Sequence, residues 1–471
     1  MKADYNQQAA IKHGPGPALV SAGPGSGKTY VLTHRIQYLI QNLGVSPEKI
    51  LVLTFSKAAA EEMKERFLSL TGQKRTKVTF GTFHSVFLRI LLSAGDYGRF
   101  RVISETEENY LMQKAMRESH LELQTYEYAD RLLAKYHSLK AKDLEAADAK
   151  ERLVIRRYEE LKRRENLLDY DDMLYETRRL FLENPGLLSV VQKKYSFILI
   201  DEFQDINPVQ YEIIRLIGKN HENIFAVGDD DQSIYAFRGA TPAVMQSFLK
   251  DYENVTEYHL YRNYRSKKRI VNHAGKVIKK NHERIRKKIR SVAKEKGTVK
   301  FRISRNKAWE YKALVKDIKH NLDRNCAILL RTNKISPELI QELDVSGIKY
   351  LIVNEMNRET KQETNREKKN KLTGEQINNN ATILIMTMHA SKGLEFDCVF
   401  IPDLYEGNIP YRLSKSKEEI EEERRVFYVA MTRAKEKLYL YGLHTFSKKK
   451  TIFKKKTGKY RISRFYMNSL F

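Results

Sequence analysis

The chain has 471 residues and a formal net charge of +26, because 85 Lys and Arg residues outnumber 59 Asp and Glu residues. This excess indicates a polyanionic partner such as nucleic acid and argues against an indifferent surface. Hydrophobic residues make up 41% of the sequence, which excludes a disordered basic tail, and the length predicts roughly two to four domains.

The first predicted element is a strand at residues 18–21, which a glycine-rich loop and a helical pattern follow directly. Further short apolar runs begin at residues 50, 197 and 224, and each ends in small or polar residues. Strands of a parallel sheet have this appearance when a site lies at their carboxyl ends. The pattern therefore predicts a first α/β domain.

Long charged stretches with helical spacing replace the strand pattern between about residues 95 and 185, and we interpret them as a helical insertion in the first domain. A second set of strand-like runs begins at residues 327, 382, 399 and 438. The predicted fold class is therefore α/β with two domains. Residues 353–380 contain almost nothing apolar, which is typical of a solvated linker.

The cysteines Cys326 and Cys398 each lie in a short apolar run, so we expect buried thiols and no disulfide, as in a reducing compartment. The first residues contain no apolar core of a signal peptide. No segment approaches the roughly 20 apolar residues of a membrane span. The sequence predicts a cytoplasmic protein that does not bind membranes.

Residues 22–29, Ala-Gly-Pro-Gly-Ser-Gly-Lys-Thr, fit a phosphate-binding loop with Ala22 in place of its usual first glycine. Small residues such as Gly25 and Gly27 allow backbone N–H groups to surround phosphates. Lys28 can reach the terminal phosphates, and the Thr29 hydroxyl can bind Mg²⁺. The alternative is a simple glycine-rich turn, but the strand before and the helix after it favour a nucleotide site.

The strand predicted at residues 197–200 ends in two adjacent carboxylates, Asp201 and Glu202. Asp201 is placed to hold Mg²⁺, and Glu202 to orient and deprotonate an attacking water. Two acids here could instead cap the next helix at its positive end. Together with a phosphate loop, they favour nucleotide hydrolysis.

The strand predicted at residues 224–228 leads into Asp-Asp-Asp-Gln-Ser-Ile-Tyr-Ala-Phe-Arg-Gly. Gln232 can sense a γ-phosphate or position water. Tyr235 and Phe237 offer faces for base stacking, and Arg238 offers a phosphate contact. A polar turn with two core aromatics is the alternative.

Residues 262–290 and 448–464 are strongly basic, with Glu283 as their one acid, and aromatic residues are interleaved with them. Such runs are often solvated faces. The net charge of the chain favours contact with a phosphate backbone.

These motifs match one family, in order, along nearly the whole chain. The matching strings are AGPGSGKT, VLTHRI, TFSKAAAEEM, GTFHS, LDYDDM, IDEFQD, VGDDDQSIYAFRGA, NYRS, LLRTN, TMHASKGLEF and EEERRVFYVAMTRA. By these strings the chain resembles superfamily-one DNA helicases of the UvrD, Rep and PcrA type. The resemblance implies two RecA-like P-loop domains with ATP between them, single-stranded DNA across both, and 3′-to-5′ movement.

On the nucleotide side, the resemblance implies ATP and Mg²⁺ as cofactors and gives Lys28, Asp201 and Glu202 the roles described above. It also makes Gln232 the γ-phosphate sensor, and a guanidinium placed at that phosphate stabilises the charge of the transition state. The remaining matches are Thr29 at the metal, Arg265 and Arg433 at the γ-phosphate, Gln7, Arg35 and Tyr264 at the adenine, and Glu395 as a nucleotide-contacting acid.

On the DNA side, two departures from the family weaken the match. Phe237 stands where these helicases commonly have Trp, which predicts weaker base stacking, and Ser56-Lys57-Ala58 replaces Thr-Asn-Lys. Trp309 lies outside every motif and is expected in the core. The DNA-contacting matches are Phe55, His84, Tyr235, Phe237, Arg238, Asn333 and His389.

The expected domain organisation has three folded parts. The first RecA-like ATP-binding domain is expected at residues 1–92 and 187–255, a helical insertion at residues 93–186, and the second RecA-like domain at residues 256–352 and 381–471. In the family, a large helical auxiliary domain interrupts the second domain. Here a flexible linker at residues 353–380 is expected in its place.

The predicted function is that of an ATP-dependent 3′-to-5′ translocase and helicase, acting as a monomer on single-stranded and 3′-tailed duplex DNA in repair or replication. A protein that loads it or raises its processivity is a further expected partner. Two alternatives stay open: a translocase that strips proteins from DNA without unwinding it, and an ATP-gated DNA-binding regulator.

Overall fold

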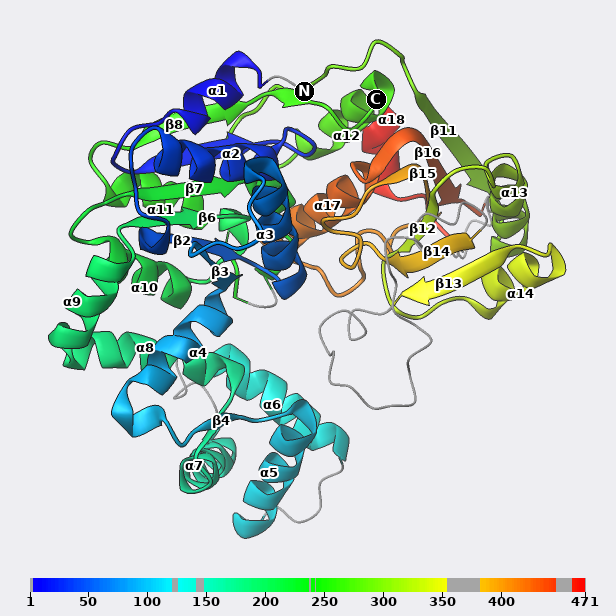
Figure 1. Ribbon diagram of the computed structural model, residues 1–471. Helices are drawn as coiled ribbons and strands as arrows, with labels where there is room; N and C mark the ends of the chain where they lie inside the picture. The colour runs from blue at the N-terminus through cyan, green and yellow to red at the C-terminus, as the bar shows by residue number, and fades with distance from the viewer. Residues whose placement is uncertain are drawn as a thin grey trace. The chain divides into compact units, whose positions relative to one another are not determined.

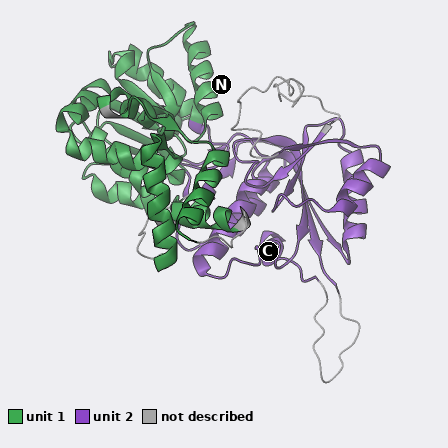
Figure 2. Cartoon of the chain, turned by 90° about the horizontal axis from the view of Figure 1, so that it is seen from below, with its two compact units in different colours: residues 1–20, 29–228, 235–258 green, residues 21–28, 229–234, 259–471 purple. Residues whose placement is uncertain are grey.

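The computed structural model describes residues 3–120, 126–140, 148–236, 239–241, 243–353, 382–445 and 460–470. They form two compact units, coloured separately in Figure 2. Unit 1 comprises residues 1–20, 29–228 and 235–258, and unit 2 comprises residues 21–28, 229–234 and 259–471. Phe237, Arg238 and residues 354–380 of the linker expected at residues 353–380 lie outside the described residues, whereas Val353 ends a strand of the second sheet.

The first sheet has six strands in the order β3-β2-β6-β7-β1-β8. β2 pairs in parallel with β3 and β6, and β6 pairs in parallel with β7. Every residue of β1, β2 and β7 is buried, as expected for apolar strands covered on both faces. The strands are β1 (Ala18–Ala22), β2 (Ile50–Thr54), β3 (Thr79–Thr82), β6 (Phe197–Ile200), β7 (Ile224–Gly228) and β8 (Thr256–Leu260).

The strands predicted near residues 18, 50, 197 and 224 are confirmed. The sequence pattern did not predict β3 and β8, which lie at the two edges of the sheet and are only partly buried, so they contain no continuous apolar run. Five further helices belong to this part of the chain: α1 (Tyr5–Ile11), α2 (Lys28–Gln41), α3 (Lys57–Thr71), α10 (Pro208–Gly218) and α11 (Ala243–Asp251).

A lobe of helices follows β3 and returns to the sheet at β6; in Figure 1 it lies on the β3 side of the sheet, away from β8. Its own core contains Leu111, Met112, Tyr136, Val154 and Tyr158, all at most 2% exposed. The elements are α4 (Phe83–Ser93), β4 (Arg101–Val102), α5 (Glu105–Glu118), α6 (Tyr126–Lys140), α7 (Ala149–Arg164), β5 (Leu167–Leu168), α8 (Tyr170–Glu183) and α9 (Pro185–Lys194).

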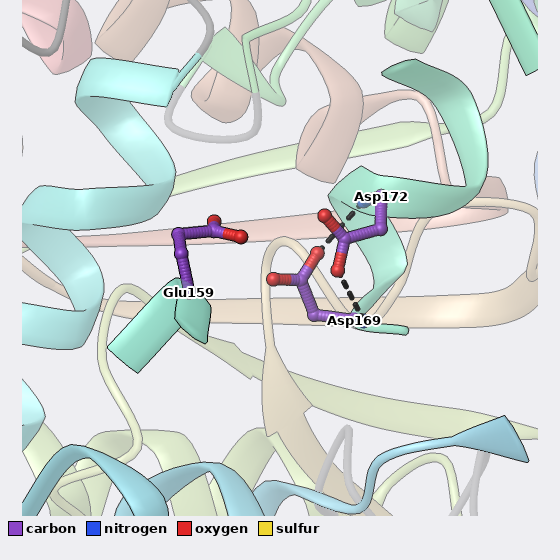
Figure 3. A group of neighbouring side chains, drawn as sticks. All are labelled: Glu159, Asp169 and Asp172. Carbon is purple, nitrogen blue, oxygen red and sulfur yellow. Dashed lines mark hydrogen bonds between the residues drawn. The ribbon is translucent and has the colours of Figure 1, made fainter. Parts of the chain in front are cut away.

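A buried ion cluster joins three helices of this lobe. Asp169 caps α8 through a reciprocal pair of hydrogen bonds with Asp172, and Glu159 of α7 faces them (Figure 3). Lys162, whose side chain is 1% exposed, contacts Asp169 and lies 2.8 Å from Asp172. Lys140 of α6 lies 2.5 Å from Asp172. Since buried carboxylates need cationic partners, the two lysines fix how α6, α7 and α8 pack.

We expect Lys162→Met to loosen this lobe, because the substitution leaves the buried carboxylates with less positive charge. Removing one partner of a buried ion pair costs about 3 kcal/mol, so amide exchange in α7 and α8 should accelerate on the order of a hundredfold. Arg156→Met, at an exposed position of the same helix, should leave exchange unchanged. Equal exchange rates in Lys162→Met and the parent would contradict the assigned role.

The second sheet also has six strands, in the order β11-β16-β15-β12-β14-β13, and every neighbouring pair is parallel. This confirms the predicted α/β fold class with two parallel sheets. The strands are β11 (Thr298–Ser304), β12 (Cys326–Leu330), β13 (Lys349–Val353), β14 (Thr382–Thr387), β15 (Phe396–Leu404) and β16 (Ala434–Leu443). A separate short pair consists of β9 (Arg262–Asn263) and β10 (Arg290–Ser291).

The core of unit 2 lies between this sheet and its helices. Cys326 and Cys398 are both fully buried and oppose each other on β12 and β15. The sequence predicts Trp309 in the core, and this prediction is wrong: Trp309 is 68% exposed, because α13 buries the face that contains Tyr311 and Leu314. The helices are α12 (Lys268–Ile278), α13 (Lys307–Lys319), α14 (Pro337–Val345), α17 (Lys417–Met431) and α18 (Arg464–Leu470).

Among the described helices, none combines the length and the apolar character that crossing a membrane requires.

Candidate functional site

The phosphate-binding loop begins at the end of β1 and continues into the first turn of α2, where Lys28 and Thr29 lie half-buried. Gly25 and Gly27 have φ angles of 65° and 85°, which glycine adopts without strain. The Ser26 hydroxyl closes the loop by donating to the Gly23 carbonyl at 2.7 Å. The loop thus has the backbone shape that a phosphate cradle needs.

Within unit 2, this loop is tied to the segment that follows β9. The buried amide of Asn263 donates to the Pro24 carbonyl at 2.7 Å, and the Tyr264 N–H donates to the Gly25 carbonyl at 2.8 Å. A Cβ atom at Gly25 would lie 2.6 Å from the Cβ of Arg265, so this close approach requires glycine. The structure therefore brings Gly25, Tyr264 and Arg265 together.

Gln232 forms a second group of contacts within unit 2. Its side-chain carbonyl accepts a hydrogen bond of 3.1 Å from Arg433, and its backbone carbonyl accepts one of 2.9 Å from Lys392. Its amide nitrogen donates to Asp229 at 2.5 Å. Arg433 is itself buried and also donates to the carbonyl of Val429. The predicted sensor and one predicted arginine are thus in direct contact.

Arg265 and Glu395 form an ion pair of 2.6 Å, and Lys435 contacts the other oxygen of Glu395 at 2.9 Å. Burial alone would raise the pKa of Glu395, but the charges of Arg265 and Lys435 outweigh it and lower that pKa. The carboxylate is therefore ionised and holds the Arg265 guanidinium. The sequence prediction placed both residues at the nucleotide, and the structure adds that they pair with each other.

In unit 1, Asp201 and Glu202 lie at the carboxyl end of β6. The Asp201 N–H donates to the Leu53 carbonyl of β2 at 2.9 Å, which aligns the two strand ends. Glu202 adopts φ 51°, an uncommon angle for a residue with a side chain, and Gln204 donates to its carboxylate at 2.6 Å. The side chain of Glu202 is thereby oriented by the loop itself.

Gln7 and Arg35, predicted at the adenine, both hold the start of unit 1 together. Gln7 completes a capping box with Asp4 at the first turn of α1. Arg35 is 2% exposed and donates to the carbonyls of Ile11, His13 and Gly14. Burial lowers the pKa of Arg35 to about 10. An adenine contact for either residue stays a prediction.

The predicted DNA-contacting residues lie near the carboxyl ends of strands in both sheets. In unit 1, Phe55 and Tyr235 stack at 4.7 Å with 13° between their planes. His84 packs edge-on against Tyr170, which is 61% exposed. In unit 2, the exposed Asn333 follows β12 and the half-buried His389 follows the neighbouring β14.

Three groups of residues with oxygen ligands are candidates for a metal site. Glu159, Asp169 and Asp172 lie close together, as do Asp229, Asp230 and Asp231, but each cluster is already paired with buried cations, Lys162 in the first and Lys287 and Arg284 in the second. Thr29 and Asp201 offer a hydroxyl and a carboxylate, the oxygen ligands that Mg²⁺ prefers. The donor set of the third group therefore fits the predicted metal.

Sequence reasoning missed Asn263, Lys287 and Arg284 as site residues. Asn263 lies in the NYRS string, but its amide makes internal contacts that a motif match does not reveal. Lys287 and Arg284 lie in a basic run that predicts a surface, whereas the Lys287 side chain is 1% exposed.

Comparisons with known proteins find helicase family models that match both halves of the chain. A family model described as UvrD/REP helicase N-terminal domain matches residues 3–253, and one described as UvrD-like helicase C-terminal domain matches residues 258–366 and 361–444. The Bacillus subtilis (strain 168) protein YjcD is 36% identical over 364 residues, which is 73% of this chain and 48% of that protein.

The ATP-dependent DNA helicases PcrA of Staphylococcus aureus (strain Mu50) and of Staphylococcus epidermidis are each 34% identical over 365 residues. Each alignment covers 74% of this chain and 50% of the relative. The chain therefore spans about half the length of the curated relatives it matches.

Asn263→Ala should weaken nucleotide binding and lower the melting temperature of the protein. It removes the donor to Pro24 and leaves the N–H groups of Arg265 and Ser266 without their acceptor, and each unsatisfied buried group costs about 1–3 kcal/mol. Asn263→Asp keeps the acceptor but replaces the donor to Pro24 with a buried negative charge, so its affinity for a fluorescent ATP analogue should also fall below that of the parent. If Asn263→Ala bound the ATP analogue as tightly as the parent, Asn263 would not be needed to hold the phosphate loop.

Proposed function

Because the chain belongs to the UvrD/Rep helicase family, we propose that it is an ATP-dependent DNA helicase that moves along single-stranded DNA in the 3′-to-5′ direction. The observation that supports this most is the buried contact of Gln232 with Arg433, in the same unit as the phosphate loop that Asn263 and Tyr264 hold. A structural glycine turn does not need a glutamine and two arginines gathered in this way.

In the proposed reaction, the amides of the loop and Lys28 bind the triphosphate. Glu202 accepts a proton from the attacking water, and Gln204 fixes the orientation of its carboxylate. Gln232 and Arg433 stabilise the charge that develops on the γ-phosphoryl group. Arg265 does the same once its guanidinium leaves the carboxylate of Glu395 and binds the phosphate.

Thr29 and Asp201 are the residues that would hold Mg²⁺. When bound, the ion neutralises phosphate charge during phosphoryl transfer. The chain's own contribution is to fix Asp201 at the end of β6 through its backbone bond to Leu53.

For DNA, we propose that the aromatic residues Phe55 and Tyr235 stack on bases, and that His84, Asn333 and His389 contact the strand. The net charge of +26 supports binding to a phosphate backbone. Tyr235 follows Gln232 by three residues. A movement of the Gln232 backbone on nucleotide binding is therefore transmitted to Tyr235 through a short chain segment.

The decisive experiment compares ATP hydrolysis by the parent and by Lys28→Ala with single-stranded DNA, single-stranded RNA and no nucleic acid. Strong stimulation by single-stranded DNA supports a motor, and weak, unstimulated hydrolysis supports an ATP-gated binding protein instead. Separation of a 3′-tailed duplex, compared with a 5′-tailed one, then tests unwinding and polarity. Displacement of a bound protein without strand separation would indicate a stripping translocase.

We predict that Lys28→Ala, Glu202→Gln and Arg433→Ala each reduce the turnover number for ATP by roughly a hundredfold or more, because each acts on the phosphates or the water. DNA binding in a filter assay should persist, which shows that the variants are folded. Near-parent hydrolysis by Glu202→Gln would show that another group is the base.

We also predict that affinity for single-stranded DNA falls steeply with salt, since each neutralised phosphate contributes about −0.7 to the slope of log K against log salt. Tyr235→Ala should weaken binding by about 1–3 kcal/mol with the slope unchanged, because a stacking contact releases no counterions. Fluorescence anisotropy over a salt series measures both. A salt-independent affinity would rule out the proposed backbone contacts.

A further inference from the structure

The three consecutive acids Asp229, Asp230 and Asp231 follow β7 and are at most 3% exposed. The Lys287 ammonium lies among them in unit 2: it contacts Asp229 and Asp230 and lies 3.6 Å from Asp231. Burial alone would lower the pKa of Lys287, but the three carboxylates outweigh burial and raise it. Lys287 is therefore a fully buried cation in the middle of a buried acidic turn.

Two neighbours of Lys287 complete the enclosure of this turn. Arg284 donates from two nitrogens to the two oxygens of Asp231, with Nε to Oδ1 at 2.7 Å. The Ile285 N–H donates to Asp230 at 2.6 Å. Residues 284–287 thus supply two positive charges and one backbone donor to the three acids.

Asp229 is the acid that links this enclosure to the proposed reaction. One of its oxygens, Oδ1, accepts from Lys287, and the other, Oδ2, accepts from the amide nitrogen of Gln232 at 2.5 Å. The amide carbonyl of Gln232 then faces Arg433. A single carboxylate therefore connects the ammonium of Lys287 with the side chain of Gln232.

The segment that contains Lys287, residues 281–291, also contacts elements that carry other parts of the proposed hydrolytic machinery. The Asn281 amide donates to the Glu421 carbonyl of α17, the helix that leads to Arg433. β10 pairs with β9, just before Arg265. A side chain on Gly23 of the phosphate loop would overlap Ile289, so the segment also packs on that loop.

We propose that Lys287 is a positioning residue for nucleotide hydrolysis, which holds Asp229 and through it orients Gln232 toward the γ-phosphate. The inference rests on the proposed function, since it assigns a further residue to the same reaction. Arg284 supports the same turn through Asp231. Neither residue touches the predicted substrate, and both act through the carboxylates.

Lys162 provides a matched control for a purely structural role. The side chain of Lys162 is as buried as that of Lys287, and it also contacts two carboxylates, those of Asp169 and Asp172. These two acids lie in the helical lobe of unit 1, and none of their described interactions involves a predicted site residue. Lys162→Met and Lys287→Met thus remove the same group from two similar clusters.

The experiment measures kcat and KM for ATP with saturating single-stranded DNA, well below the melting temperature of each variant. Lys287→Met should lower kcat by about 10- to 100-fold, because a displaced catalytic group loses its alignment with the reacting atoms, and should leave KM within about threefold. Lys162→Met should lower the melting temperature and leave both constants unchanged.

A second variant tests whether Lys287→Met lowers kcat only because the protein is destabilised. The three acids Asp229, Asp230 and Asp231 carry a charge of −3, and Lys287 and Arg284 carry +2, so the net charge of the cluster is −1. Lys287→Met changes this net charge to −2. Adding Asp230→Asn to Lys287→Met restores it to −1. The double variant should therefore regain stability while its kcat stays low, since Asp229 still lacks its ammonium. Recovery of kcat together with stability would overturn the positioning role.

Two results separate a failure of this inference from a failure of the proposed function. If the parent protein hydrolyses no ATP with DNA, the proposed function fails. If the parent hydrolyses ATP and Lys287→Met keeps parent kcat, or if Lys287→Met and Lys162→Met lose kcat equally, only the positioning role is wrong.

Discussion

Burial of charge is the constraint on which the organisation of this molecule depends. A carboxylate removed from water must find a cation or a set of N–H donors, or it becomes protonated. Both buried acidic clusters meet this requirement with lysines from other elements of the chain: Lys287 is 58 residues from Asp229 in sequence, and Lys140 is 32 residues from Asp172. Each cluster therefore fixes the position of one segment against another more specifically than apolar packing does, because an ammonium must reach particular oxygens.

The same requirement explains which parts of the molecule the sequence predicts. Apolar runs such as residues 50–54 and 224–228 identify the central strands because those strands are buried on both faces. The phosphate loop is also predictable, since its conformation depends on local residues such as Gly25 and Gly27. Edge strands β3 and β8 have no comparable local signal, because only part of each is covered.

Long-range partners are what the sequence does not specify. The basic run at residues 262–290 predicts a phosphate-binding surface, yet one of its lysines, Lys287, is buried among acids. The interpretation of Glu395 as a nucleotide contact likewise did not include its pairing with Arg265. In each case the sequence indicates that a charged residue is present, and only the fold determines which opposite charge it meets. Trp309 is the converse case, since its exposure depends on which face α13 buries.

Pairing within the site has a consequence for how a nucleotide would be recognised. Arg265 is held by Glu395, and Arg433 by Gln232 and the Val429 carbonyl. A hydrogen bond to a charged group contributes about 1.5–3 kcal/mol, so a ligand must offer a stronger acceptor to draw either guanidinium away. A terminal phosphate, with several charged oxygens, is such an acceptor, whereas neutral polar groups are not. Because Glu395 also pairs with Lys435, its charge stays compensated when Arg265 leaves, and that residual pairing lowers the free energy needed for the exchange. The arginines are thus held in a way that favours release to a highly charged ligand over a weakly charged one.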